Sequence, residues 1–284
     1  MDPFVVTIVL TAAIFHAGWN AVVKSSGDRL ISMTIILGMG GVMSLPLVVV
    51  LPLPDAESWP YLIASVILHV PYNAMLARAY SHGDLSHIYP IARGSAPLYV
   101  ALLAALFFGE VLNTGETIAI LTICGGILSL AVIGQRHAVG FKPLLYALFI
   151  GLLIGLYTVA DGAGVRRTEN PFSYIAWLFL IQGAIVTALT IWRRWGVVRV
   201  NTRKVWKTSA LGGMVASLAY GMVIWAMSLT PMAHVSTLRE TSVIAAALIG
   251  TRLLGEAGGL WRVAAAAIVA LGVIGLQFTA SAPV

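Results

Sequence analysis

Charged residues are scarce in this chain. Only 10% of its 284 residues are Asp, Glu, Lys or Arg, whereas a soluble globular domain has about 25%. Hydrophobic residues make up 59% of the sequence, and its mean hydropathy is +0.93. Because so few charges cannot cover a surface that faces water, this composition excludes a soluble enzyme.

Cysteine and the usual signatures of catalysis are nearly absent as well. Cys124 is the one cysteine of the chain, so no internal disulfide can form. No group of His, Cys and carboxylate residues has metal-ligand spacing, no glycine-rich phosphate loop follows a strand, and no Ser–His–acid motif is present. The sequence therefore predicts no catalytic residues, no metal and no cofactor, and the protein is expected not to be an enzyme.

Long apolar runs are what the chain does have. A helix needs about 20 apolar residues to cross a bilayer, so at about 28 residues for each span and loop the chain has room for about ten crossings. The runs are separated by Gly, Pro and charged residues. We expect an all-α integral membrane protein with transmembrane helices near residues 3–24, 31–53, 59–81, 86–108, 113–134, 142–162, 171–193, 206–229, 234–254 and 260–280.

Basic residues gather on one side of the expected bundle. The net charge is +6, and Lys and Arg flanking spans orient membrane proteins, so no nucleic-acid partner is inferred. The longest connection, from Arg193 to Trp206, is basic, whereas the opposite side carries only Arg166 and Arg167. This bias places the basic side in the cytoplasm and both termini outside. The first run lacks a basic leader and is expected to be a retained span, not a signal peptide.

The sequence contains an internal repeat. An offset of 146 residues superposes Arg93 on Arg239, Gly109-Glu110 on Gly255-Glu256 and Gly126 on Gly272. The repeat predicts two five-helix halves, residues 1–137 and 138–284. Because five is odd, the second half enters the membrane from the opposite side, which makes an inverted repeat. Such a repeat places a binding site near the midplane that opens alternately to each side.

Charged residues within the spans are candidates for that site. A charge at the centre of a span costs roughly 2.5 kcal/mol or more and normally faces the bundle interior. In the fourth span, Tyr89 and Arg93 lie on one helix face, and Pro90 and Pro97 leave backbone carbonyls without donors. Two interpretations stay open. Arg93 lines a cavity, which we favour, or it sits at a packing kink and is satisfied by those carbonyls or by an acid on another span.

Polar and aromatic residues in the middle of other spans complete the candidate set. Those of the third span, including His69, share one face, and mid-span aromatics such as Tyr220 are too deep for an interfacial belt. A lone His in a membrane span often makes only a helix–helix hydrogen bond. His16, with Trp19 and Asn20 beside it in the first span, is therefore either part of a binding face or part of the helix packing. The predicted substrate contacts are His16, Trp19, Asn20, Tyr72, Asn73, Tyr89, Arg93, Tyr157, Asp161, Trp225, Arg239 and Glu240.

The repeat and its motifs resemble the drug/metabolite transporter superfamily, specifically its ten-helix EamA-domain transporters. The resemblance is carried by the Gly-Glu pairs, by the Gly-rich fifth and tenth spans, and by the stretches His16–Asn20, Tyr89–Gly94 and Tyr157–Gly162, which are similar to a bacterial branch. It implies a central cavity lined by spans 1, 3, 4, 6, 8 and 9, with spans 5 and 10 at the periphery. In many relatives both termini lie in the cytoplasm, opposite to the charge bias.

These features predict a secondary transporter of the bacterial inner membrane that moves a small polar or amphiphilic metabolite, such as an amino acid or related zwitterion, by alternating access. Arg93 and Arg239 would attract a carboxylate, while Asp161 or Glu240 would balance an ammonium group. No nucleotide-binding motif is present, so a gradient or exchange would drive transport, and a coupling proton could bind Asp161, Glu240 or His16. The alternatives are a carrier of quaternary amines or cationic drugs and, in another class, a non-transporting membrane subunit or chaperone.

Overall fold

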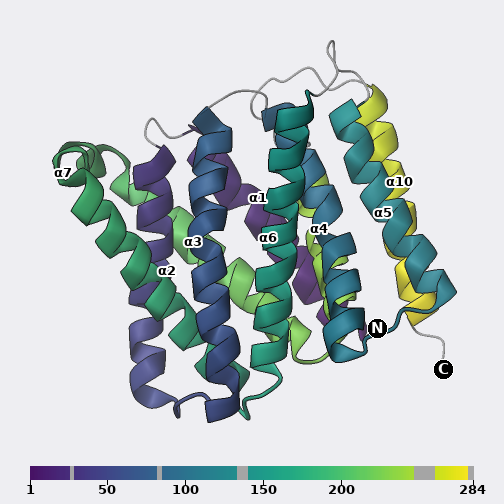
Figure 1. Cartoon of the computed structure of the whole chain (residues 1–284), viewed down its shortest axis with the longest axis horizontal. Coiled ribbons are helices and arrows are strands. Elements are labelled where there is room, and N and C mark those ends of the chain that lie inside the picture. The colour runs from purple at the N-terminus through teal and green to yellow at the C-terminus, as the bar shows by residue number, and fades with distance from the viewer. Residues whose placement is uncertain (26–28, 82–84, 133–139, 246–259, 281–284) are drawn as a thin grey trace.

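The computed structural model describes residues 1–25, 29–81, 85–132, 140–245 and 260–280, and within these ranges the chain forms helices and no strand. Figure 1 shows the long helices standing side by side as a bundle, with both termini at one end. In chain order the helices are α1 (Pro3–Ser25), α2 (Arg29–Val50), the 3-10 helix η1 (Ala56–Ser58), α3 (Trp59–Ser81), α4 (Leu85–Phe108), α5 (Thr114–Val132), α6 (Phe141–Val165), α7 (Pro171–Met227), α8 (Met232–Arg239) and α10 (Leu260–Ala280).

The helices have the length and surface of membrane spans. Within the described residues, eight helical stretches are long and apolar enough to cross a bilayer, and α7 contains two of them, at 171–194 and 205–227. Large apolar side chains such as Phe278 point outward, and Phe278 is 76% exposed. Such a surface suits lipid and not water. The chain is an all-α integral membrane protein, as predicted. α3 is less apolar because it carries the polar residues His69 and Asn73 along one side.

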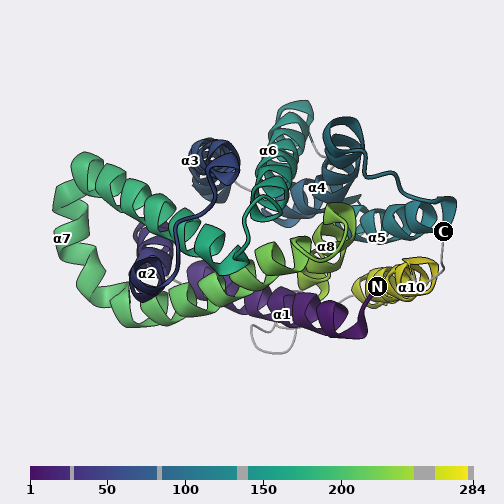
Figure 2. The same ribbon diagram turned by 90° about the horizontal axis from the view of Figure 1, so that it is seen from below.

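α7 is a helical hairpin made without a loop. Asn170 caps its start by accepting a hydrogen bond from the backbone N–H of Phe172, and Pro171 occupies the first turn, where its missing N–H costs nothing. Within α7 the backbone leaves helical geometry only at Arg194 (φ −138°, ψ 33°), and Figure 2 shows α7 folding back on itself. The two predicted spans are present, and the predicted connection between them, from Arg193 to Trp206, is helical on both sides of this bend.

The ninth predicted span, 234–254, is interrupted. α8 ends at Arg239, and a turn at Glu240 and Thr241 follows before the backbone becomes helical again. The hydroxyls of Thr237 and Thr241 donate to the carbonyls of Ala233 and Leu238, and such side-chain bonds compete with the helical ladder and bend helices. Because of this break, the adjacent side chains of Arg239 and Glu240 point to different places, Arg239 to a cavity and Glu240 to Arg93. Residues 246–259 of the predicted span lie outside the described residues.

The packing of the helices follows the exchange expected of an inverted repeat. α6 packs against α3 and α4, while α1, its counterpart in the first half, packs against α7 and α8. Each half therefore places its first helix between helices of the other half. Two spans sit apart, since α5 and α10 pair with each other at one edge of the bundle (Figure 1). The boundaries of the halves at 1–137 and 138–284 stay a prediction.

Small residues allow the closest approaches between helices. A Cβ added to Gly183 of α7 would lie 2.7 Å from the carbonyl oxygen of Leu37 on α2. A Cβ added to Gly213, on the second span of α7, would lie 2.8 Å from the carbonyl oxygen of Ile36. Because backbone can approach backbone this closely only where no side chain intervenes, these glycines hold α2 between the two spans of α7. This seating fixes one wall of the cavity described next.

Candidate functional site

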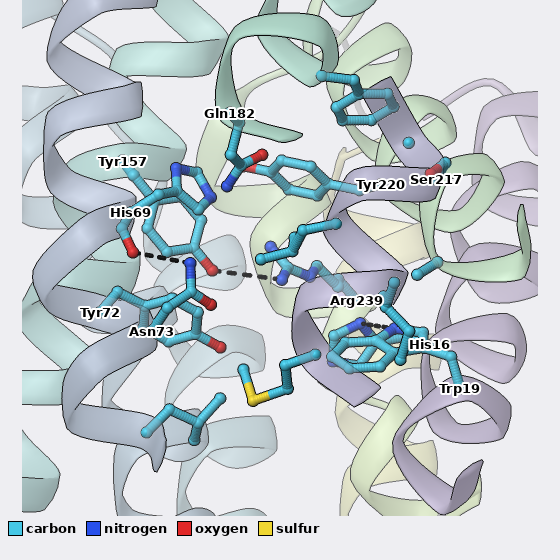
Figure 3. Close-up of a pocket in the computed structure, with 17 residues that line it drawn as sticks. His16, Trp19, His69, Tyr72, Asn73, Tyr157, Gln182, Ser217, Tyr220 and Arg239 are labelled. Carbon is cyan, nitrogen blue, oxygen red and sulfur yellow. Dashed lines mark hydrogen bonds between the residues drawn. The ribbon is translucent and has the colours of Figure 1, made fainter. Parts of the chain in front are cut away.

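A cavity of about 90 Å³ lies within the bundle, between α1, α2, α3, α6, both spans of α7, and α8 (Figure 3). One water molecule needs roughly 10–15 Å³ of such space, so the cavity has room for several water-sized groups. Its rings are His16, Trp19, His69, Tyr72, Tyr157, Phe179 and Tyr220. Its other polar side chains are Asn73, Gln182, Ser217 and Arg239, and no carboxylate among the described residues lines it.

Arg239 is the cation of the cavity. Its Nη2 donates to the hydroxyl of Tyr157 at 3.4 Å, and its guanidinium carbon lies 5.1 Å from the ring centroid of Tyr220. Its side chain reaches toward these two rings in Figure 3. In the part of the chain that the structure describes, no carboxylate lies within 4.0 Å of it, although Arg239 is only 5% exposed. The direct contacts of this charge among the described residues are therefore with a phenol and a ring and not with a carboxylate, which leaves the guanidinium able to bind an anion.

Arg93, the repeat counterpart of Arg239, is neutralised. Its Nε lies 2.5 Å from Oε2 of Glu240, and the two side chains are 2% and 0% exposed. Its Nη2 donates to the hydroxyl of Ser242 at 3.2 Å, and its guanidinium carbon lies 5.8 Å from the ring centroid of Tyr89. The second interpretation of Arg93 is therefore the one the structure favours, since an acid on another span satisfies it. The pair joins α4 to the turn after α8.

Asp161 on α6 lies behind the cavity wall and is fully buried. The hydroxyl of Tyr174 donates to its Oδ1 at 3.1 Å, and the hydroxyl of Tyr220 donates to its Oδ2. Both tyrosines belong to α7, one on each span. Because Tyr220 also lines the cavity, a single side chain connects this carboxyl to the cavity.

Two polar faces of α1 and α3 meet the cavity from opposite sides. On α1, Trp19 Nε1 donates to Nδ1 of His16 at 3.2 Å, which aligns both rings along the wall. On α3, the ring of His69 stacks on Tyr157 with centroids 4.1 Å apart and an interplanar angle of 27°. Asn73 donates from Nδ2 to the carbonyl of His69 at 2.8 Å, which leaves its side-chain oxygen as an acceptor.

The end of the bundle that holds the termini is tied together around Arg166. Its Nε donates to the carbonyl of Met227 at 2.7 Å and its Nη2 to the carbonyl of Thr230 at 2.8 Å, while Nη1 pairs with Glu110. Oε2 of Glu110 also accepts the backbone N–H of Met232 at 2.9 Å. The α4–α5, α6–α7 and α7–α8 connections are thereby joined at this end of the bundle.

Comparison with protein-family models adds a decisive observation. Residues 141–278, which contain α6, α7, α8 and α10, match the EamA-like transporter family. These residues form an EamA-like transporter domain. The resemblance inferred from the sequence is confirmed, and the protein is a multi-pass membrane transporter of the drug/metabolite transporter type, a family that is not enzymatic.

The fold of this EamA-domain protein also has a relative of known structure. A solved structure described as "Crystal structure of protein" superposes with a TM-score of 0.74, covering 97% of this chain and 96% of that chain at 15% sequence identity. At that identity the likeness concerns the fold alone. A search of curated proteins found no match.

The EamA-domain protein places half of its predicted substrate contacts on the cavity: His16, Trp19, Tyr72, Asn73, Tyr157 and Arg239. Asn20 instead donates from Nδ2 to the carbonyl of His16 at 2.7 Å. Tyr89, Arg93 and Glu240 form the ion-pair cluster, and Asp161 lies behind Tyr220. Trp225 packs edge-on against Phe4, with ring centroids 6.2 Å apart. The span list implied by the family is corrected too, because α2 and both spans of α7 line the cavity and α4 contributes none of its described residues.

Several lining residues of this EamA-domain protein were not in the predicted set. His69 and Tyr220 lie mid-span and carry the same signal as Tyr72 and Tyr157, so the polarity of their spans could have found them. Gln182 is a buried amide in an apolar span, which a search for ionisable residues alone overlooks. The α2 wall, which includes Met33 and Ile36, has no polar signal, and only the close seating of α2 against α7 places it here.

Proposed function

We propose that this EamA-domain protein is a secondary carrier of the bacterial inner membrane for a small amphiphilic carboxylate, such as an amino acid or related zwitterion. The observation that carries the proposal is the position of Arg239, a buried guanidinium on an aromatic cavity that no described carboxylate lines. A cation held this way inside a membrane marks a substrate pathway by default. It favours an anionic group on the substrate over a purely cationic one.

The lining suits a substrate with an apolar body. Trp19, Tyr72 and Phe179 present ring surfaces to the cavity, and ligand pockets are mostly apolar with a few polar groups that fix orientation. The carboxylate would bind the guanidinium of Arg239 through charge-assisted hydrogen bonds. An ammonium group would be accepted by the side-chain oxygens of Asn73 and Gln182. Alternating access would require the Arg166 contacts at the termini end to open.

The first test is ligand binding by three probes that share a phenyl body and differ in charge. These are 3-phenylpropionate (anion), L-phenylalanine (zwitterion) and phenethylamine (cation). A ligand at about one hundred times its Kd stabilises a protein by about 2.7 kcal/mol, so we expect the first two probes to raise the unfolding temperature in detergent. The Arg239→Gln variant should lose this response to both carboxylates. No response to either carboxylate in the wild-type protein would contradict the proposal.

The second test is transport of labelled L-phenylalanine into proteoliposomes, with protein-free liposomes as the control. Uptake that saturates and that 3-phenylpropionate inhibits is the expected result. Inhibition by phenethylamine with indifference to carboxylates would favour the carrier of amines instead. Carboxylate binding without uptake, together with a stoichiometric copurifying partner, would favour a non-transporting subunit.

A further inference from the structure

Asp161 has an arrangement that the binding of a carboxylate substrate does not use. The carboxyl is fully buried between α6 and the two spans of α7, and both of its oxygens accept phenol hydrogen bonds, from Tyr174 and Tyr220. None of the described ion pairs includes it. It is therefore an acid with hydrogen-bond donors but no counter-cation in contact, set one side chain away from the cavity.

The groups around Asp161 come from each helix that packs on α6. α3 supplies Ser65, whose hydroxyl lies 3.3 Å from Nδ1 of His69, and His69, whose Nδ1 also contacts the Ser65 carbonyl at 2.9 Å. α8 supplies Arg239, which interacts with Asp161 at longer range. Other titratable or charged groups on these helices include Tyr157 on α6, Tyr174 and Tyr220 on α7, and Arg93 on α4, which is paired with Glu240. The exposed acids Asp55 and Glu57 lie beside η1, which also packs on α6.

Both protonation states of this carboxyl can be accommodated. An ionised acid buried in a membrane without a partner is costly, and a bound proton removes that cost. The phenol donors support the ionised form, because hydrogen bonds to a carboxylate stabilise it. A group opposed by burial and supported by donors can take up and give up a proton, whereas Glu240, in direct contact with Arg93, is held as part of an ion pair.

Tyr220 links such a proton to the substrate. When Asp161 is ionised, Oδ2 accepts the Tyr220 hydroxyl. When a proton from water binds Oδ2, that O–H can donate to the Tyr220 oxygen, so the Tyr220 hydroxyl keeps its own proton and is free to donate it to another acceptor. The Tyr220 ring lines the cavity and lies under the Arg239 guanidinium at 5.1 Å. A carboxylate on Arg239 is an acceptor within that region.

We propose that the Asp161 carboxyl is the proton-binding site of the carrier, and that Tyr220 couples its protonation to occupancy of the cavity. This inference rests on the proposed function. A proton enters from one side and binds Oδ2, the released Tyr220 hydroxyl favours substrate at Arg239, and the proton leaves to water on the other side. By linkage, if the protonated protein binds the substrate more tightly, then bound substrate must raise the affinity of the protein for the proton by the same factor.

The proton site is tested first without any substrate. Infrared difference spectra of the full-length protein in lipid, recorded across pH, report a protonated carboxyl by its carbonyl band. We expect a band that titrates in the wild type, disappears in Asp161→Asn and persists in Glu116→Gln, an acid near the termini end. Should Asp161→Asn fail to fold, Tyr220→Phe serves, because loss of a phenol donor moves the titration to higher pH. A band absent from the wild type, retained in Asp161→Asn, or lost instead in His69→Gln overturns the proposal.

Coupling is tested in proteoliposomes with L-phenylalanine and an imposed pH gradient. In the wild type the gradient should drive accumulation. Asp161→Asn should reach only equal concentrations on both sides while phenylalanine–phenylalanine exchange continues. Gradient-driven accumulation by Asp161→Asn overturns the inference but leaves the proposed function intact. If the wild-type protein neither binds nor moves a carboxylate probe, the proposed function fails and coupling to it fails with it, whereas the infrared titration still decides whether Asp161 binds a proton.

Discussion

Arg93 and Arg239 are equivalent in the sequence repeat and opposite in their surroundings. Arg93 contacts Glu240 at 2.5 Å and does not line the cavity. Arg239 faces the cavity, and among the described residues it contacts the phenol of Tyr157 and the ring of Tyr220. Both are almost fully buried, at 2% and 5% exposure. The difference between them is thus the presence of a counter-charge and not the depth in the bundle.

The residue after each arginine explains this difference. The offset of 146 residues that superposes the arginines also superposes Gly94 on Glu240. Gly94 is tightly packed, since an added Cβ would lie 2.9 Å from Cγ of Leu128 on α5. The first half therefore provides no acid at the position where the second half provides Glu240. Glu240 therefore pairs with Arg93 across the two predicted halves, and the guanidinium of Arg239 stays available to a ligand.

The largest effect is expected from removing the neutralised arginine. Arg93→Met leaves Glu240 buried without its partner, and breaking a buried ion pair in this way costs about 3–5 kcal/mol of stability. We expect Arg93→Met to unfold in detergent at a clearly lower temperature than Arg239→Met, because Arg239 contacts no carboxylate among the described residues and its removal leaves no acid unpaired. The double variant Arg93→Met with Glu240→Gln should recover most of the loss, because no unpaired charge remains. A double variant no more stable than Arg93→Met would show that the pair does not hold the fold.

The spans were predictable because each is an apolar run whose length matches the membrane. α3 and α6 follow the predicted boundaries within three residues. The sharp bend at Arg194 could not be predicted in the same way, because the basic residues around it are as common in loops as in helices. The break after Arg239 was missed for a related reason, because no Gly or Pro marks it and the competing bonds come from threonine hydroxyls.

The candidate site was only partly predictable, because polarity shows which residues avoid lipid and not what they contact. Arg93 and Glu240 are 147 residues apart in the sequence, and only the packing of α4 against α8 brings them together. The same limit applies to Asp161, whose phenol partners lie on both spans of α7. The comparison of Gly94 with Glu240 was, however, visible in the repeat. It is a sequence signal that distinguishes the two arginines.

A smaller effect is expected when Arg93 or Arg239 is replaced by lysine. These variants keep the positive charge and change the shape of the charged group, so they show which of the two matters. Arg239→Lys keeps a cation on the cavity but loses the planar fork that binds a carboxylate through two hydrogen bonds. We expect binding of 3-phenylpropionate to weaken about tenfold, roughly 1.4 kcal/mol, with little change in stability. Arg93→Lys should leave affinity unchanged and unfold at a temperature between those of the wild type and Arg93→Met. Equal losses of affinity in the two lysine variants would remove the distinction between the sites.

The smallest effect concerns the hydroxyl that each guanidinium contacts through Nη2, Tyr157 for Arg239 and Ser242 for Arg93. A net hydrogen bond is worth about 0.5–1.5 kcal/mol, and the Tyr157 contact is long at 3.4 Å, so the lower limit applies. Tyr157→Phe keeps the ring that stacks on His69 and removes only the oxygen that orients Arg239. We expect about a twofold loss of affinity for 3-phenylpropionate at 0.5 kcal/mol, measured by titration calorimetry in detergent. Ser242→Ala is the matched control and should leave affinity unchanged, because Glu240 still holds Arg93. A loss in Ser242→Ala equal to that in Tyr157→Phe would mean that the ion pair positions the ligand site after all.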